Sequence, residues 1–238
     1  MLHGWGINHT VWKTFSSRLT GFDKIISPCL YDVADQINDS SLMSLANETG
    51  SNIKNDCVVI GWSLGGLIAL YLATMFKKVK GVIFITSTPK FVNNGNWLFT
   101  IDISDHQDLY RNLTENHDQA VRYFSQLIAH GDVSAKQTIN YLSSHLTERK
   151  YNNTLLSWLN ELEQSDLRHQ LSALSVPTLI LLANNDALIK PDISVQLKKL
   201  NPNLNIKTLY ECGHAPFISK ERETTKLIKD FIDAEFDR

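Results

Sequence analysis

The chain has 238 residues, of which 43% are hydrophobic, and 23 basic against 25 acidic side chains give a formal net charge of −2. This length fits one α/β domain that buries a large core, and the balanced charge excludes the strongly basic composition typical of proteins that bind nucleic acid or membrane surfaces. Three cysteines without a Cys-x-x-Cys pair, no signal peptide and no apolar run of the ~20 residues that span a bilayer predict a cytoplasmic protein with reduced thiols and no metal site or cofactor.

Four apolar segments are predicted to form strands, at residues 57–60, 81–86, 177–182 and 205–210. The first three are continuous and rich in β-branched residues, a pattern typical of parallel strands covered on both faces. The fourth alternates between apolar and polar residues, which places it nearer an edge of the sheet. We therefore expect a mostly parallel sheet flanked by helices.

Helical spacing of apolar residues predicts helices at 64–76, 193–200 and 226–236. The alternation of strand and helix favours right-handed βαβ units. Residues 91–174 break this alternation, because they contain no strand-like run and their periodicity predicts several helices, among them 119–128 and 155–162. We expect residues 1–90 and 175–238 to form an α/β core, and residues 91–174 to form a helical lid inserted into it.

A candidate nucleophile lies between the first strand and the helix that follows it. Gly61-Trp62-Ser63-Leu64-Gly65 matches G-x-S-x-G in the strand-turn-helix context that gives this motif its meaning. The sharp turn forces the serine into a strained backbone conformation, and the glycines let the chain pass close to itself. The hydroxyl then sits above a helix N-terminus, which favours a developing anion. A chance match on a glycine-rich turn is the alternative.

A base and an acid follow Ser63 in the chain order of α/β hydrolases, which is serine, acid, histidine. His214 comes just after the fourth strand, in Cys212-Gly213-His214-Ala215-Pro216. Asp186 directly follows the third strand and would orient the imidazole, although Asn184-Asn185-Asp186 also suits an Asx-turn. Asp192 is the fallback acid. His3-Gly4-Trp5-Gly6 is similar to the loop that supplies one oxyanion donor, so the N–H groups of Trp5 and Leu64 are the candidate pair.

Three of these segments together resemble the pimeloyl-[acyl-carrier protein] methyl ester esterases of biotin synthesis, within the α/β-hydrolase fold. They are His3-Gly4-Trp5-Gly6, Gly61-Trp62-Ser63-Leu64-Gly65-Gly66 and Gly213-His214-Ala215-Pro216-Phe217-Ile218-Ser219. The resemblance implies a serine carboxylesterase that removes the methyl group from a pimeloyl chain on acyl carrier protein. It also implies substrate contacts from Trp5, Ser63, Leu64 and a lid segment, which comprises Phe124, Ser125, Gln126, Leu127 and Ile128. Simple helix packing is the alternative role for this segment.

Two departures from that family shape the expectations. Family members carry strands before His-Gly, so the opening strands are expected to be missing from this sheet, through a misassigned start, a trimmed sequence or a natural truncation. Residues 91–170 hold six basic and ten acidic side chains, a net charge of −4, whereas a surface that docks an acidic carrier protein should be basic. The candidate docking residues are Arg122, Lys136, Arg149 and Lys150.

The motifs predict an ester hydrolase that acts as a monomer, and the resemblance implies that its substrate is bound to a carrier protein. Two alternatives stay open on the residues alone. A general short-chain carboxylesterase would have the same triad, and a non-catalytic binding protein would keep the fold.

Overall fold

The computed structural model describes residues 1–236. Their central sheet has the strand order β1-β2-β5-β6, and all three pairings are parallel. The strands are β1 (Cys57–Trp62), β2 (Val79–Ile85), β5 (Thr178–Ala183) and β6 (Asn205–Leu209). The predicted parallel sheet is confirmed, and β6 lies at one edge, where its half-exposed alternation suits contact with solvent.

The other edge of this sheet meets the first residues of the chain. Leu2 forms a parallel bridge with Gly61, in which the Leu2 N–H donates to the Ile60 carbonyl at 2.8 Å and the Trp62 N–H donates to the Leu2 carbonyl at 3.1 Å. The His-Gly loop therefore leaves the sheet alongside the end of β1, next to the turn that holds Ser63.

Helices flank the sheet. The helix α4 (Leu64–Met75) is buried from Leu64 to Leu70 and packs against β1 and β2, whereas α12 (Glu221–Phe236) packs against β5. A helix that is apolar on all sides is expected where neighbours cover it completely. Here α3 (Leu42–Ser51) and α9 (Arg168–Ser172) contact α4, and α9 in turn contacts α10 (Ile193–Leu200).

Residues 7–56 form short helices that the sequence pattern did not predict. They are the 3₁₀ helix η1 (His9–Trp12) and the helices α1 (Lys13–Ser16), α2 (Leu30–Ile37) and α3. Each is short, and α3 contains glycine, serine and asparagine, which weaken helix propensity. Tertiary packing stabilises them, because Leu42, Leu45 and Ala46 of α3 are buried.

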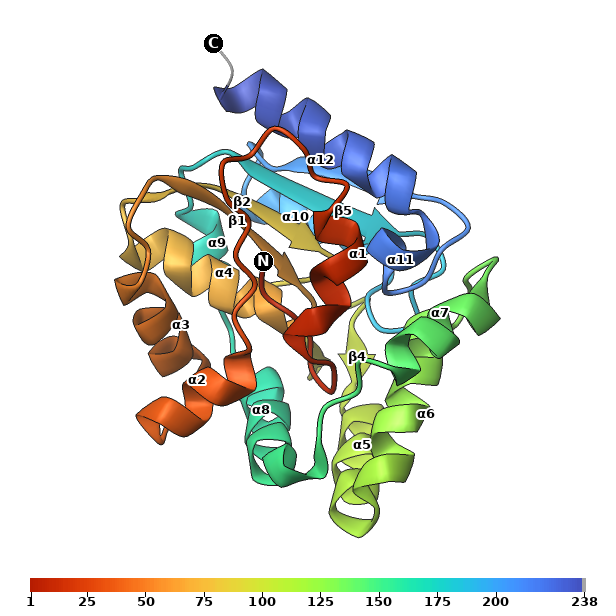
Figure 1. The fold of residues 1–238 in the computed structure, drawn as a ribbon. Helices are drawn as coiled ribbons and strands as arrows, with labels where there is room; N and C mark the ends of the chain where they lie inside the picture. The colour runs from red at the N-terminus through yellow and green to blue at the C-terminus, as the bar shows by residue number, and fades with distance from the viewer. Residues whose placement is uncertain (237–238) are drawn as a thin grey trace.

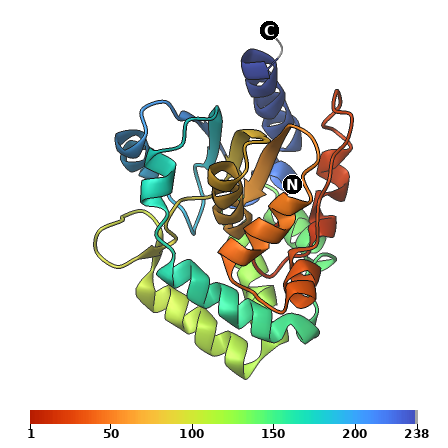
Figure 2. The same ribbon diagram turned by 90° about the vertical axis from the view of Figure 1, so that its left-hand side faces the viewer.

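The insertion, defined here as residues 91–174, is mainly helical. It comprises α5 (Ile103–Glu115), α6 (His117–Ala129), α7 (Ala135–Ser143), the 3₁₀ helix η2 (Arg149–Tyr151), α8 (Asn152–Gln164) and α9. The expectation that it lacks strands was wrong at one point, because β3 (Val92–Asn93) and β4 (Ile101–Asp102) form a separate parallel ladder. Two-residue strands are too short to produce a periodic pattern. Helices α5, α6 and α8 gather at the end of the molecule opposite α12, whereas α7 lies beside α11 (Figure 1; Figure 2 shows the same ribbon turned by 90°).

The short helix α11 (Pro216–Ser219) follows β6 and contacts both α12 and α7. None of the helices built by residues 1–236 has the length and apolar composition to cross a membrane.

Candidate active site

Ser63 occupies the turn between β1 and α4 with φ 53° and ψ −125°. A non-glycine residue in this region costs about 1–3 kcal/mol and persists only where its surroundings hold it. The Ser63 N–H donates to the Ile85 carbonyl at 3.1 Å, and the Ser63 carbonyl accepts from the Ser87 hydroxyl at 2.7 Å. Ile85 is the last residue of β2 and Ser87 follows it, so the neighbouring strand and the residues after it hold the serine in its strained conformation.

Two glycines around Ser63 are required by close backbone contacts. A Cβ atom on Gly61 would lie 2.4 Å from the Gly65 carbonyl oxygen, and one on Gly65 would lie 2.4 Å from the Leu2 carbonyl oxygen and 2.7 Å from that of His3. The chain thus passes close to itself at Gly61, as the motif predicted. Gly65 also lets the His-Gly loop rest directly on the start of α4.

Ser63, His214 and Asp186 form one connected set of hydrogen bonds. The Ser63 Oγ lies 2.9 Å from His214 Nε2, and His214 Nδ1 lies 2.8 Å from Asp186 Oδ2. The other carboxylate oxygen of Asp186 accepts the N–H groups of Leu188 at 2.8 Å and Ile189 at 3.1 Å. Because Nδ1 donates to the carboxylate, Nε2 is left to accept the serine proton, which is the arrangement a general base needs.

The set is almost completely removed from solvent. His214 is fully buried, and Ser63 and Asp186 are each 5% exposed. Exclusion of water strengthens the electrostatic interactions inside such a site. The fallback acid, Asp192, lies instead at the residue before α10.

The carbonyl of His214 accepts two hydrogen bonds that the sequence pattern did not reveal. The donors are the indole N–H of Trp62 and the hydroxyl of Thr86, each at 2.7 Å. Thr86, at the end of β2, is buried with φ 41°, a further strained residue beside the triad. The nearest sequence signal is the tryptophan within the nucleophile motif, but its separation of 152 residues from His214 hid the contact.

The His-Gly loop supplies backbone donors next to the serine. A Cβ on Gly4 would lie 3.2 Å from the Ser63 Cβ, so the loop is in direct contact with the nucleophile. Within residues 1–236, the N–H groups of Trp5 and Leu64 donate to no acceptor. The Trp5 indole is buried and donates to the Leu155 carbonyl at 2.9 Å, which fixes the side chain against the insertion.

His3 anchors this loop. Its Nε2 accepts the Leu30 N–H at 3.0 Å, its Nδ1 donates to the Gly4 carbonyl at 2.9 Å, and its ring stacks on Tyr31. Complete burial lowers the pKa of His3 to about 4, so the ring is neutral near pH 7. Because both ring nitrogens are engaged in hydrogen bonds to the backbone, His3 holds the loop in place.

The α6 residues expected to contact substrate divide into two groups. Phe124, Ser125 and Ile128 are buried and Leu127 is partly buried, whereas Gln126 is exposed. The Phe124 ring packs edge-on against Trp5 at 4.8 Å between centroids, so the structure brings these two candidates together. The Ser125 hydroxyl donates to the Arg122 carbonyl within the helix. Trp5 and Phe124 thus form an apolar wall on the loop that contacts the serine, and Ile128, whose carbonyl accepts the His214 N–H, is buried near the end of the same helix as Phe124.

The four candidate docking residues are all exposed but only partly gathered. A hydrogen bond from His117, followed by the charges of His117, Arg122 and Arg149, lowers the pKa of Asp118, so both arginines act on the same carboxylate. Lys150 pairs with Glu148 at 3.4 Å. Lys136 lies apart from the other three, on α7.

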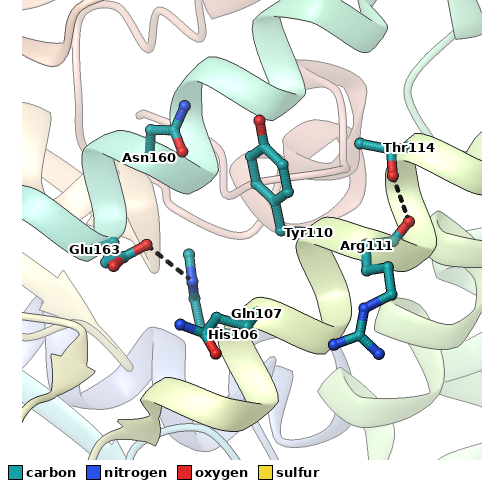
Figure 3. A pocket seen from close by; sticks show the side chains of 7 residues that line it. All are labelled: His106, Gln107, Tyr110, Arg111, Thr114, Asn160 and Glu163. Atoms are coloured by element: carbon teal, nitrogen blue, oxygen red, sulfur yellow. Dashed lines mark hydrogen bonds and ion pairs between the residues drawn. The ribbon is translucent and has the colours of Figure 1, made fainter.

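A cavity of about 460 Å³ lies between α5 and α8 (Figure 3). Polar side chains line it, and one of them, His106, lies 3.5 Å from the Glu163 carboxylate while its Nε2 is 2.9 Å from the Leu159 carbonyl. None of Ser63, Asp186 and His214 borders this cavity, so it is separate from the candidate reaction site.

Comparison with known proteins places this fold and site in one class. A model of the family described as alpha/beta hydrolase fold matches residues 53–221. An esterase from Exiguobacterium antarcticum superposes with a TM-score of 0.77 at 17% identity, covering 97% of this chain and 90% of that one. At that identity the likeness concerns the fold alone. Fold, family match and site together define a serine hydrolase of the α/β-hydrolase class.

Sequence relatives narrow the class. The pimeloyl-[acyl-carrier protein] methyl ester esterase of Photobacterium profundum is 30% identical over 237 residues, which cover 98% of this chain and 93% of that protein. The protein of the same name from Stenotrophomonas maltophilia is 28% identical over 98% of this chain and 92% of its own length. The chain belongs to the α/β-hydrolase fold family and, within it, to the family of these esterases.

Proposed function

We propose that this protein is a serine carboxylesterase that hydrolyses the methyl ester of pimeloyl-acyl carrier protein to pimeloyl-acyl carrier protein and methanol, in biotin synthesis. The observation that carries the proposal is the hydrogen-bonded set Ser63–His214–Asp186, next to the His-Gly loop that bears Trp5. The names of the relatives support the substrate. They favour neither a general short-chain carboxylesterase nor a non-catalytic binding protein.

The geometry supports the following chemistry. His214 Nε2 takes the hydroxyl proton as Ser63 Oγ attacks the ester carbonyl, and Asp186 stabilises the imidazolium. The N–H groups of Trp5 and Leu64 stabilise the oxyanion, together with the N-terminus of α4. His214 then gives its proton to the departing methoxide, which leaves as methanol. A water molecule activated by the same nitrogen hydrolyses the acyl-serine and releases the product.

The apolar wall suits the carbon chain of the substrate. Trp5, Phe124 and Ile128 offer no charge to a pimeloyl chain, whose ester end is uncharged until it is hydrolysed. The carboxylate that hydrolysis produces would lie at Ser63, beside the oxyanion donors and His214, and not against this wall. The wall would therefore hold the carbon chain, while the donors hold the reacting end.

The proposal is tested by growth and by chemistry together. A strain lacking its own pimeloyl-ester esterase should grow without biotin when it expresses this chain, and should not grow with Ser63→Ala. The purified protein should release methanol from carrier-bound pimeloyl methyl ester. Hydrolysis of short p-nitrophenyl esters with neither growth nor methanol release would instead support a general esterase. No hydrolysis of any ester would support a non-catalytic binding protein.

We propose further that the carrier protein docks on the insertion, at Arg122, Arg149, Lys150 and Lys136. The charges of the first two both act on Asp118, so these arginines are tested together. Reversing both to glutamate should raise KM for carrier-bound substrate about tenfold and leave p-nitrophenyl butyrate unaffected. Lys226→Glu on α12, at the opposite end of the molecule, is the matched control (Figure 1). An equal loss on the small ester would exclude docking there.

All three triad residues come from one chain, so the proposed reaction needs no second copy. We therefore expect the active protein to be a monomer. The composition of the chain favours, in addition, a cytoplasmic protein that binds neither nucleic acid nor membrane. Light scattering of the active fraction should give the mass of one chain.

A further inference from the structure

The last residues of α6 and the turn after them contact both loops that carry the acid and the base. This segment, residues 128–133, is called the α6 exit segment below. The His214 N–H donates to the Ile128 carbonyl at 2.9 Å, and the Gly213 N–H donates to Asp132 Oδ1 at 2.6 Å. Consecutive peptide groups of the histidine loop are therefore held by the insertion, 81 or more residues away in the sequence.

The same segment holds the loop that carries Asp186. The side-chain amide of Asn185 donates to the Gly131 carbonyl at 2.8 Å, and the Asn185 N–H donates to the Cys212 carbonyl at 3.2 Å. The acid loop, the base loop and the α6 exit segment thus form one closed set of contacts. Any displacement of this segment would change the distance between the acid and the base.

The approach of these three segments is as close as their backbones allow. A Cβ on Gly213 would lie 2.5 Å from the His130 carbonyl oxygen and 2.7 Å from that of Ile128. Gly131 has φ 82°, and a Cβ there would lie 2.4 Å from the Asn185 Cβ. Two glycines from different parts of the chain therefore permit the contact. Interiors packed this tightly transmit displacements between neighbours instead of absorbing them.

Asp132 is the side chain on which this contact depends. It is 9% exposed, and its second oxygen, Oδ2, has no hydrogen-bond partner among the described residues. A buried carboxylate with a single hydrogen bond is costly to keep. The part of this side chain that the fold uses is therefore the single oxygen that accepts the Gly213 N–H.

The carbonyl side of His214 completes the arrangement. Trp62 and Thr86 bind that carbonyl from the sheet, while the α6 exit segment binds the N–H groups of Gly213 and His214. The histidine backbone is held between the core and the insertion. We propose that Asp132 is a positioning residue, with Asn185 in support, which aligns His214 with Ser63 and couples the triad to helix α6. This inference rests on the proposed esterase activity and deepens it.

The test compares Asp132→Ala with Asp132→Asn, because an asparagine oxygen can still accept the Gly213 N–H while the charge is removed. With p-nitrophenyl acetate, Asp132→Ala should lower kcat about tenfold per active site titrated with a fluorophosphonate, and should leave KM within twofold. Asp132→Asn should retain kcat within threefold. Asn185→Ala, whose hydrogen bond is exposed, should lower kcat two- to threefold. Asp108→Ala, an exposed aspartate on α5, is the control and should match the wild type.

Each outcome separates this inference from its rivals. A merely structural role would reduce the titrated fraction of active protein and leave kcat per active site unchanged, which would overturn the proposal. An equal loss in Asp132→Asn and Asp132→Ala would assign the effect to charge and would also overturn it. The downfield proton resonance of the His214–Asp186 hydrogen bond gives a readout independent of substrate, and it should be broadened or lost only in Asp132→Ala. A sharp, unshifted resonance in that variant would overturn positioning even if the wild type hydrolysed no ester.

Discussion

Gly65→Ala probes the contact between the nucleophile turn and the His-Gly loop. The new Cβ would lie 2.4 Å from the Leu2 carbonyl oxygen, and real Cβ atoms do not approach closer than about 3.0 Å, so the loop must retreat by roughly 0.6 Å. Both affected carbonyls, of Leu2 and His3, are backbone atoms, so no side-chain rotation relieves the contact. The displacement acts two or three residues before Trp5, the proposed oxyanion donor.

The expected magnitude follows from that donor. Loss of one oxyanion donor costs about 10²–10³ in kcat, and misplacement by about 1 Å can cost 10²-fold. We expect Gly65→Ala to lower kcat on p-nitrophenyl acetate about 10²-fold, or roughly 2.7 kcal/mol of transition-state stabilisation. KM should change little, because the oxyanion forms only after the substrate is bound.

A matched control separates catalysis from stability. Gly21 has φ 96°, and no atom lies within 4 Å of the methyl group that an alanine would add there, so Gly21→Ala strains the backbone without touching the site. It should lower the melting temperature and leave kcat unchanged. A folded Gly65→Ala protein with kcat within threefold of the wild type would refute the assignment of the loop as an oxyanion donor.

Three further predictions concern other parts of the site. Asp186→Asn should lower kcat about 10³–10⁴-fold with little change in KM, because an amide no longer stabilises the correct tautomer and the imidazolium; stopped-flow hydrolysis measures it, and a tenfold loss or less would contradict the assignment. Burial lowers the pKa of His3 from 6.5 to about 4, so the folded protein resists protonation of this ring. The free energy of unfolding should therefore fall by up to about 3 kcal/mol as the pH falls from 6.5 to 4. Urea unfolding of His3→Gln should lack this component, and an identical pH profile would exclude it. Trp62→Phe and Thr86→Val each remove one donor to the His214 carbonyl, and each should lower the free energy of unfolding by about 1 kcal/mol. The double variant should lower it by more than the sum, because the carbonyl is then buried without a partner. Additive shifts of the melting temperature would show that the two donors act independently.

Local pattern was sufficient for the elements with strong periodicity. The strands around Val59, Ile83 and Ile180 are continuous apolar runs, and a parallel strand buried on both faces leaves that trace in any sequence. The position of Ser63 followed from a motif whose spacing reflects backbone contacts at Gly61 and Gly65. The helices α2 and α3 left no such trace, because their stability comes from packing.

From the sequence we could predict the order of the candidate residues along the chain, their places at the ends of predicted strands and the family to which they point. Which of these residues meet depends on the tertiary structure. It joined Ser63, His214 and Asp186 through hydrogen bonds of 2.9 and 2.8 Å, and it brought Phe124 against Trp5. It also revealed Asp132 beside Gly213, a contact between residues 81 positions apart. The physical reason is that periodicity records the environment of each residue along its own element, whereas a hydrogen bond between distant loops depends on how the elements pack.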